Sequence, residues 1–121
     1  MLTRKIEADS MLFYDGDTLV LTVEETDLDG GVLLTMKGEI RSDTTHHIQD
    51  ELEAFISVGL KVTIDFTDAT FIAPSVLNAL LNVQQLADFF RKGEIVLRHL
   101  PDEIYQKMDA NGITELLMIE D

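Results

Sequence analysis

The stretch that decides the fold is "KVTIDFTDATFIAPSVLNALL", Lys61 to Leu81. At its start, Val62, Ile64 and Phe66 alternate with more polar residues, and this period of two predicts a β-strand over 60–66. At its end, leucines recur at helical spacing, and the pattern continues far enough to predict a helix over 75–91. The segment between them is expected to be a loop. A strand followed directly by a helix is typical of an α/β domain.

The second half of this stretch is unusually apolar. No charged residue occurs from Ala69 to Ala87, which is close to the length of a membrane span. Asparagines, glutamines and Pro74 interrupt it, and such polarity is costly in hydrocarbon, so a span is excluded. Its apolar residues instead cover more than one helical stripe, so we expect them to be buried: Leu77, Leu80, Leu81, Val83, Leu86 and Phe90.

The same change of period continues outward on both sides. Upstream, 18–25 and 32–40 read as strands joined by a hairpin loop, and 43–58 reads as an amphipathic helix that Ser42 or Asp43 can cap. Downstream, "KGEIVLRHL" reads as a strand, 101–111 as a helix begun by Pro101, and 113–121 as a last strand. This alternation predicts an α/β fold with a mixed, mostly parallel sheet of four to five strands.

The length of 121 residues fits one folded domain. We assign residues 18–121 to it, and residues 1–17 to an N-terminal extension with at most one edge strand. The opening residues carry the basic pair Arg4-Lys5 without an apolar run behind it, so no secretory signal is predicted.

Composition limits the partners. Asp and Glu number 23 against nine Lys and Arg, and the net charge is −14. Nucleic acids and anionic membranes are therefore poor partners, whereas a basic protein surface is compatible, and the charge can also serve solubility alone. The chain has no cysteine, which excludes disulfides and thiolate chemistry and is consistent with a cytoplasmic location.

Few residues point to chemistry. His46 and His47 are adjacent, so a helix directs them about 100° apart, and His99 is distant in sequence; no metal site is predicted. Phosphate-binding loops are absent from the sequence. Asp65 and Asp68 flank the end of the central strand, where ligands often bind, but such residues also serve turns. No nucleophile and base can be paired, so we predict no catalytic residue, no cofactor and no enzyme.

Three segments together resemble a known family. They are "MKGEI" at 36–40, "VTIDFTDATFIAPSVLNALL" at 62–81 and "HLPDEIYQKMDANGITELLMIE" at 99–120. In order and spacing they are similar to the STAS domain, which is shared by sulfate transporters and anti-sigma-factor antagonists. The resemblance covers about residues 18–120 and implies helices packed mainly on one face of the sheet.

The resemblance also implies a regulatory serine. The family motif D-S-S-G falls on Ala73-Pro74-Ser75-Val76, so Ser75 is the phosphorylation candidate. The motif Asp, its first Ser and its Gly are replaced here, which removes a carboxylate, stiffens the loop and reduces backbone freedom. Ser at a helix start can also be a plain N-cap, and the two roles are compatible.

Two functions remain open. The first is a non-catalytic signalling module that docks on a protein partner, such as a GHKL-type serine-kinase anti-sigma factor. Its partner-binding loop would comprise Asp68, Thr70, Ala73, Pro74, Ser75 and Val76. The second is a module of the same fold, without the phospho-switch, that binds a small molecule: an apolar ligand or a nucleotide. An apolar ligand would contact Ile72, Ala73, Val76 and Leu77.

Overall fold

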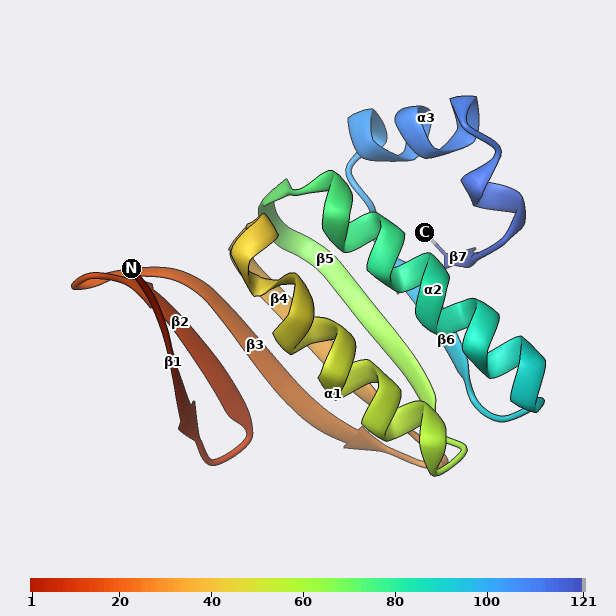
Figure 1. The fold of residues 1–121 in the computed structure, drawn as a ribbon, viewed down its shortest axis with the longest axis horizontal. Coiled ribbons are helices and arrows are strands. Elements are labelled where there is room, and N and C mark those ends of the chain that lie inside the picture. The colour runs from red at the N-terminus through yellow and green to blue at the C-terminus, as the bar shows by residue number, and fades with distance from the viewer. Residues whose placement is uncertain (121) are drawn as a thin grey trace.

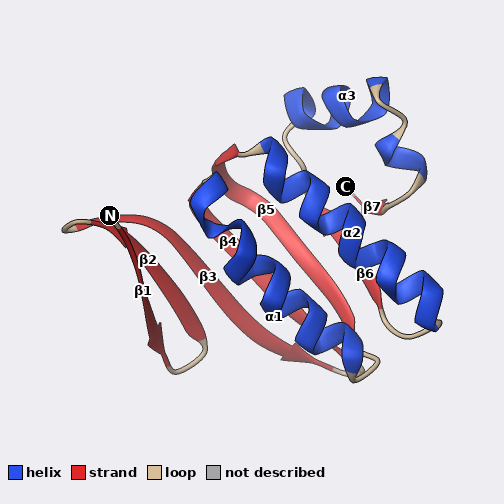
Figure 2. Cartoon of the chain, in the orientation of Figure 1, coloured by secondary structure: helices blue, strands red, loops and turns tan. Residues whose placement is uncertain are grey.

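Seven strands form one sheet in the order in which they occur along the chain (Figures 1 and 2). We describe residues 1–120 of a computed structural model of the 121-residue chain. The strands are β1 Leu2–Glu7, β2 Ser10–Asp15, β3 Thr18–Leu28, β4 Gly31–Ile40, β5 Lys61–Ile72, β6 Glu94–Arg98 and β7 Met118–Glu120. Neighbours from β1 to β4 are antiparallel, and those from β4 to β7 are parallel. This is the expected mixed sheet, because short turns join antiparallel strands and helices join parallel ones.

Three α-helices provide the parallel crossovers. They are α1 Thr45–Ser57, α2 Pro74–Phe90 and α3 Asp102–Ala110, with short 3₁₀ turns η1 Ser42–Thr44 and η2 Ile113–Glu115. The predicted helices are therefore confirmed to within about two residues at their ends. Both figures show α1 and α2 lying side by side on the same face of the sheet, with α3 beyond it near the start of α2. Among residues 1–120, none of these helices is both long and apolar enough to cross a membrane.

The core lies between that face of the sheet and the inner sides of α1 and α2. Alternate residues of the central strands face it, as the period of two requires, and Leu21, Leu34 and Ile64 are at most 2% exposed. From the helices, Leu52 and Leu80 fill the same layer.

The prediction of four to five strands was too low. Residues 2–15, where at most one edge strand was expected, form the β1–β2 hairpin, which continues the sheet beyond β3. Its one fully buried side chain is Phe13, whose ring lies 5.5 Å from that of His47 on α1. Most of β1 is exposed and charged, which hides the strand from a search for apolar alternation. The division at residue 17 remains a prediction.

Two other boundaries differ. β5 does not end at Phe66 but continues to Ile72 with irregular pairing to β4, so the expected loop is largely strand. The last strand is only Met118–Glu120, because Ile113–Glu115 forms the turn η2.

The expected burial of the α2 residues holds for one side of the helix only. Val76, Leu80 and Val83 are at most 1% exposed, but Leu86 is 37% and Phe90 is 61% exposed. A helix that packs on a sheet buries one stripe, and Leu86 and Phe90 lie outside it.

Candidate functional site

The junction between β5 and α2 positions the candidate serine. Only Ala73 separates the strand from the helix, and its backbone N–H donates to the carbonyl oxygen of Ile40 at 2.9 Å. Pro74 occupies the first helical position, where its lack of an N–H costs nothing. Ser75 is therefore the second residue of α2.

Ser75 is not the N-cap, contrary to one of the two roles considered for it. Ala73 occupies the cap position with extended backbone angles, and no side chain caps the helix. Instead, the Ser75 hydroxyl lies 2.9 Å from the hydroxyl of Thr45, and either can donate the hydrogen bond. Both residues are partly buried.

Thr45 is the first residue of α1, so the hydrogen bond joins the starts of two adjacent helices. Helix starts carry partial positive charge and backbone N–H groups without intrahelical partners. Two of them meeting at one hydroxyl pair make a position suited to a covalently attached anion. The sequence gave no sign of Thr45, because thirty residues separate it from Ser75.

The six residues of the predicted partner-binding loop are not equivalent in the structure. Asp68, Thr70 and Pro74 are exposed, and Ser75 is half-buried. Ala73 and Val76 are 3% and 1% exposed, so their side chains belong to the core. A partner approaching this surface would meet the other four, together with Phe71, which is 50% exposed.

The carboxylates considered for chemistry have local roles. The backbone N–H and the hydroxyl of Thr67 donate to one Asp65 carboxylate oxygen, at 2.9 and 2.6 Å. Burial raises the pKa of Asp65, but these hydrogen bonds, with the nearby His99 and Arg98, outweigh it and hold the pKa below its usual range. Asp68 lies on β5 opposite Lys37 of β4. This arrangement stabilises ionised Asp65 and does not activate it as a base.

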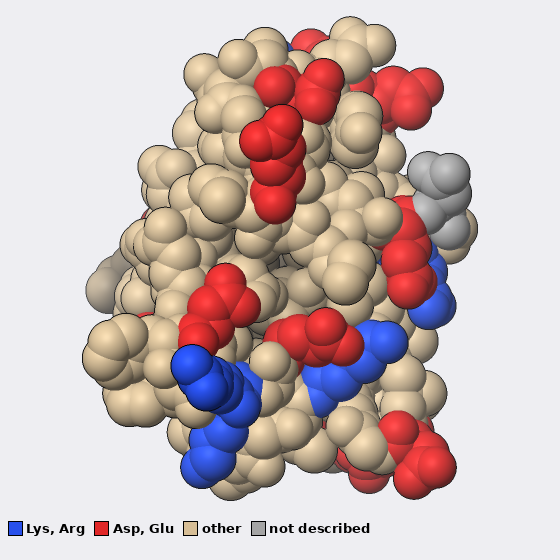
Figure 3. Space-filling model, turned by 90° about the vertical axis from the view of Figure 1, so that its right-hand side faces the viewer, with Lys and Arg blue, Asp and Glu red and all other residues tan. Residues whose placement is uncertain are grey.

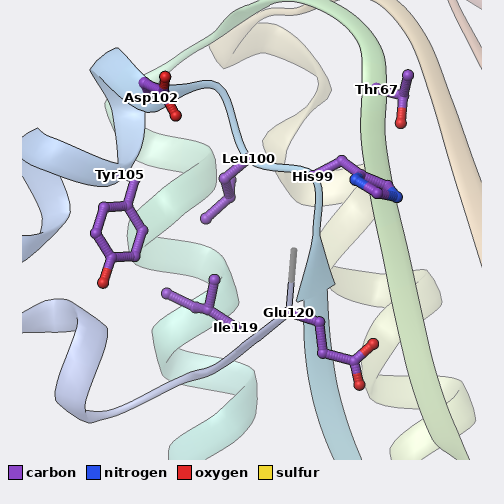
Figure 4. Close-up of a pocket in the computed structure, with 7 residues that line it drawn as sticks. All are labelled: Thr67, His99, Leu100, Asp102, Tyr105, Ile119 and Glu120. Atoms are coloured by element: carbon purple, nitrogen blue, oxygen red, sulfur yellow. The ribbon is translucent and has the colours of Figure 1, made fainter.

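The largest cavity lies beyond the carboxyl ends of β5 and β6, beside α3, and has a volume of about 610 Å³ (Figure 4). Its polar side chains do not converge. In Figure 4, His99 points towards Thr67 on β5, whereas Tyr105 lies on the opposite side with α3. Glu120 points away from both and pairs with Arg98 at 3.3 Å. No shared reaction centre results.

A smaller groove of about 320 Å³ borders the junction and bears on the small-molecule alternative. Ile72, Pro74 and Leu77 form one wall, and Ile104 and Lys107 of α3 form the other. Of the four residues expected to contact an apolar ligand, Ile72 and Leu77 line this groove. Ala73 and Val76 do not line it.

Metal binding has no framework in the part of the chain that the structure describes. No group of three His, Asp or Glu side chains there is placed to hold an ion. The rings of His46 and His47 have centroids 3.9 Å apart, and His47 stacks towards Phe13. Burial, followed by the charges of His46 and Arg4, lowers the pKa of His47.

Charge is spread unevenly over the surface. Figure 3 shows the side of the molecule that carries α3 and β7; acidic side chains are dispersed over it, and the basic ones gather in its lower part. An approaching partner with basic groups would be favoured over most of this face.

Comparison with known proteins identifies the fold. The family model "Mlab, STAS domain" matches residues 24–119. No curated protein sequence matches the chain. Three solved structures resemble it at low sequence identity, so their likeness concerns the fold alone.

A Thermotoga maritima protein proposed to be an anti-sigma factor antagonist (TM1081) superposes with a TM-score of 0.73 at 16% identity, over 82% of this chain and 86% of its own. An anti-sigma factor antagonist from Mycobacterium paratuberculosis gives 0.64 at 17% identity, over 82% and 84%. The Bacillus cell fate determinant SpoIIAA, in its phosphorylated form, gives 0.65 at 13% identity, over 82% and 91%. With the family model covering most of its length, the chain belongs to the STAS domain family.

Proposed function

We propose that this chain is a non-catalytic, cytoplasmic signalling module that docks on a protein partner, and that phosphorylation of Ser75 controls the docking. The observation that carries the proposal is the position of the Ser75 hydroxyl, 2.9 Å from that of Thr45 where α1 and α2 both begin. The fold shared with proteins named as anti-sigma factor antagonists, one of them solved in a phosphorylated form, supports it.

A phosphate on Ser75 would change this position in two ways. It would add about −1.5 to −2 charges at pH 7, near helix amides that can accommodate an anion. It would also replace the hydroxyl that Thr45 now contacts, so the starts of the two helices would be held by a different set of hydrogen bonds. Because the nearest partner-facing residues are Thr70, Phe71 and Pro74, which carry no charge, the new charge would have to be desolvated when a partner docks.

The partner best suited to this surface combines an apolar contact for Phe71 with basic groups that suit a chain of net charge −14. A GHKL-type serine-kinase anti-sigma factor would fit, since it would both modify Ser75 and bind the surface. Ala73, Pro74 and Val76 depart from the family motif, so such a kinase would have to accept a stiffer, apolar approach to the serine.

The test uses the full chain and a serine-kinase anti-sigma factor from the same organism. Intact-mass spectrometry after co-expression should detect one phosphate, which Ser75→Ala removes and Thr45→Val retains. In a pull-down, Ser75→Asp should bind the partner more weakly than Ser75→Ala does. Thr45→Val is the matched control, because it breaks the same hydrogen bond without adding charge. An unphosphorylated Ser75, combined with equal binding by the Ala and Asp variants, would contradict the switch.

The groove between α2 and α3 favours a second function, binding of a small apolar molecule. A ligand that binds only the native state raises the melting temperature. A thermal-shift screen would find one, and Leu77→Asp, which places a charge in the groove wall, should abolish the shift.

A further inference from the structure

The β1–β2 hairpin lies outside the residues that match the family model, which begin at Glu24. It forms one edge of the sheet, and β1 pairs with β2 on one side only (Figure 1). The hairpin is anchored, because the backbone N–H of Glu25 on β3 donates to the carbonyl oxygen of Asp9 in its loop at 2.7 Å. An anchored strand with an open edge can accept another strand.

The hairpin loop determines which backbone groups face the open edge. Only Ala8 and Asp9 separate the paired residues Glu7 and Ser10. The residues that flank a two-residue loop form a hydrogen-bonded pair, and such pairs alternate along an antiparallel ladder. Odd-numbered residues of β1 therefore bond to β2, and the N–H and C=O groups of Leu2, Arg4 and Ile6 point outward.

The side chains of β1 divide between the two faces of the sheet. Lys5 and Glu7 share one face, and their charged groups are 2.9 Å apart. Ile6 lies on the other face, the one with the helices, and is 64% exposed. An apolar residue at the centre of an open strand, beside a pair of opposite charges, is a self-complementary arrangement.

We propose that β1 pairs antiparallel with β1 of a second copy of this chain, with the two-fold axis at Ile6. The outward groups allow only registers that place even residues in hydrogen-bonded pairs. With the axis at Arg4, Lys5 or Glu7, that residue would face its own copy and repel it. With the axis at Ile6, the two isoleucines pack together, and each Lys5 lies opposite Glu7 of the other copy.

The charges thus exclude neighbouring registers and permit one, which is how edge strands avoid unspecific pairing. Local charge also favours this edge for self-association. The segment Leu2–Glu7 holds two basic side chains and one acidic one in a chain of net charge −14, so two copies repel each other less here than elsewhere. The contact is small, so a weak, reversible dimer is expected.

The first test measures self-association of the tag-free chain by sedimentation velocity, from about 10 µM to about 1 mM, the range in which small interfaces form. Lys5→Glu and Glu7→Lys should each weaken the dimer at least about tenfold, since each turns two attractive cross-strand pairs into repulsive ones. The double swap should restore the affinity to within about threefold. Lys61→Glu, a matched charge change at the exposed pair with Glu94, should have no effect.

The second test fixes the register. Ile6→Cys introduces a single cysteine into a chain that has none, and its two copies would meet with Cα atoms about 5.5 Å apart, suitable for a disulfide. Thr3→Cys, on the same strand, would hold them about 20 Å apart. Mild oxidation should cross-link the Ile6→Cys chain only. A chain that stays monomeric at about 1 mM, a double swap no better than the single ones, or equal cross-linking of both cysteine variants would overturn the proposal.

Discussion

Replacing Gln84 by Met should destabilise the fold although the volume is kept. Gln84 lies on the buried side of α2 and is 9% exposed. Its side-chain carbonyl oxygen accepts a hydrogen bond from the backbone N–H of Ile95 at 2.9 Å. β7 pairs with β6 only from Val96 onward, so no strand offers Ile95 an acceptor on that side. The glutamine takes the place of the missing strand.

The magnitude follows from that geometry. Met fills similar space but leaves the buried N–H of Ile95 without an acceptor, which costs about 1–3 kcal/mol of unfolding free energy. The other half of the amide donates to Asp88 at 2.9 Å, and Asp88 is exposed. Asp88 also stands in the last turn of α2, where a negative charge is unfavourable, so Asp88→Ala should change stability by less than about 0.5 kcal/mol. Comparing the two variants isolates the buried hydrogen bond.

Urea denaturation monitored by far-UV circular dichroism is the assay. With a slope of about 1–3 kcal/mol per molar urea, Gln84→Met should lower the midpoint by roughly 1 M at unchanged slope, and Asp88→Ala should leave it in place. Amide hydrogen exchange should show faster exchange at Ile95 in Gln84→Met. A loss below about 0.5 kcal/mol, with the protection of Ile95 intact, would refute the reasoning.

Three further outcomes are expected. Leu80→Ala should cost about 2–5 kcal/mol in a urea melt, because Leu80 is 1% exposed, whereas Leu86→Ala on the outer side of α2 should cost less than about 1 kcal/mol. Gly38→Ala should cost more than about 2 kcal/mol, since φ is +112° and a Cβ would overlap the backbone of β3. Thr67→Val should raise the pKa of Asp65, which NMR titration of its carboxyl group measures; because the folded pKa is depressed, the stability that Asp65 contributes is present above the unfolded value of about 4 and lost as the pH falls through the folded pKa.

Each of these expectations has a result that contradicts it. Equal losses for the two leucine variants would mean that α2 is turned differently. For the glycine, Gly16→Ala is the control: φ is +62° there, but no atom lies within 4 Å of the added Cβ, so about 1–2 kcal/mol is expected. A loss at Gly38 no larger than at Gly16 would remove the steric part of the argument. An unchanged Asp65 titration in Thr67→Val would show that the hydroxyl does not hold the carboxylate.

Local order along the chain was sufficient to predict much of this protein. The period of two in residues 60–66 and the helical spacing in 75–91 predicted a strand followed by a helix, and both exist. The order of the elements and three short motifs predicted a STAS domain, which the family match confirms. These features are readable because periodicity and caps reflect neighbours within one or two turns.

Other features depend on residues far apart in the chain, and no local pattern reports them. β1 is a strand because its backbone pairs with β2, although its side chains are mostly exposed and charged. β5 continues past Phe66 because β4 lies beside it. The site shows the same division: the motif pointed to Ser75, but only the packing of α1 against α2 brings Thr45 within 2.9 Å of it and leaves the N-cap to Ala73. Hydrogen bonds across thirty residues are decided by how elements pack, so they belong to the tertiary structure alone.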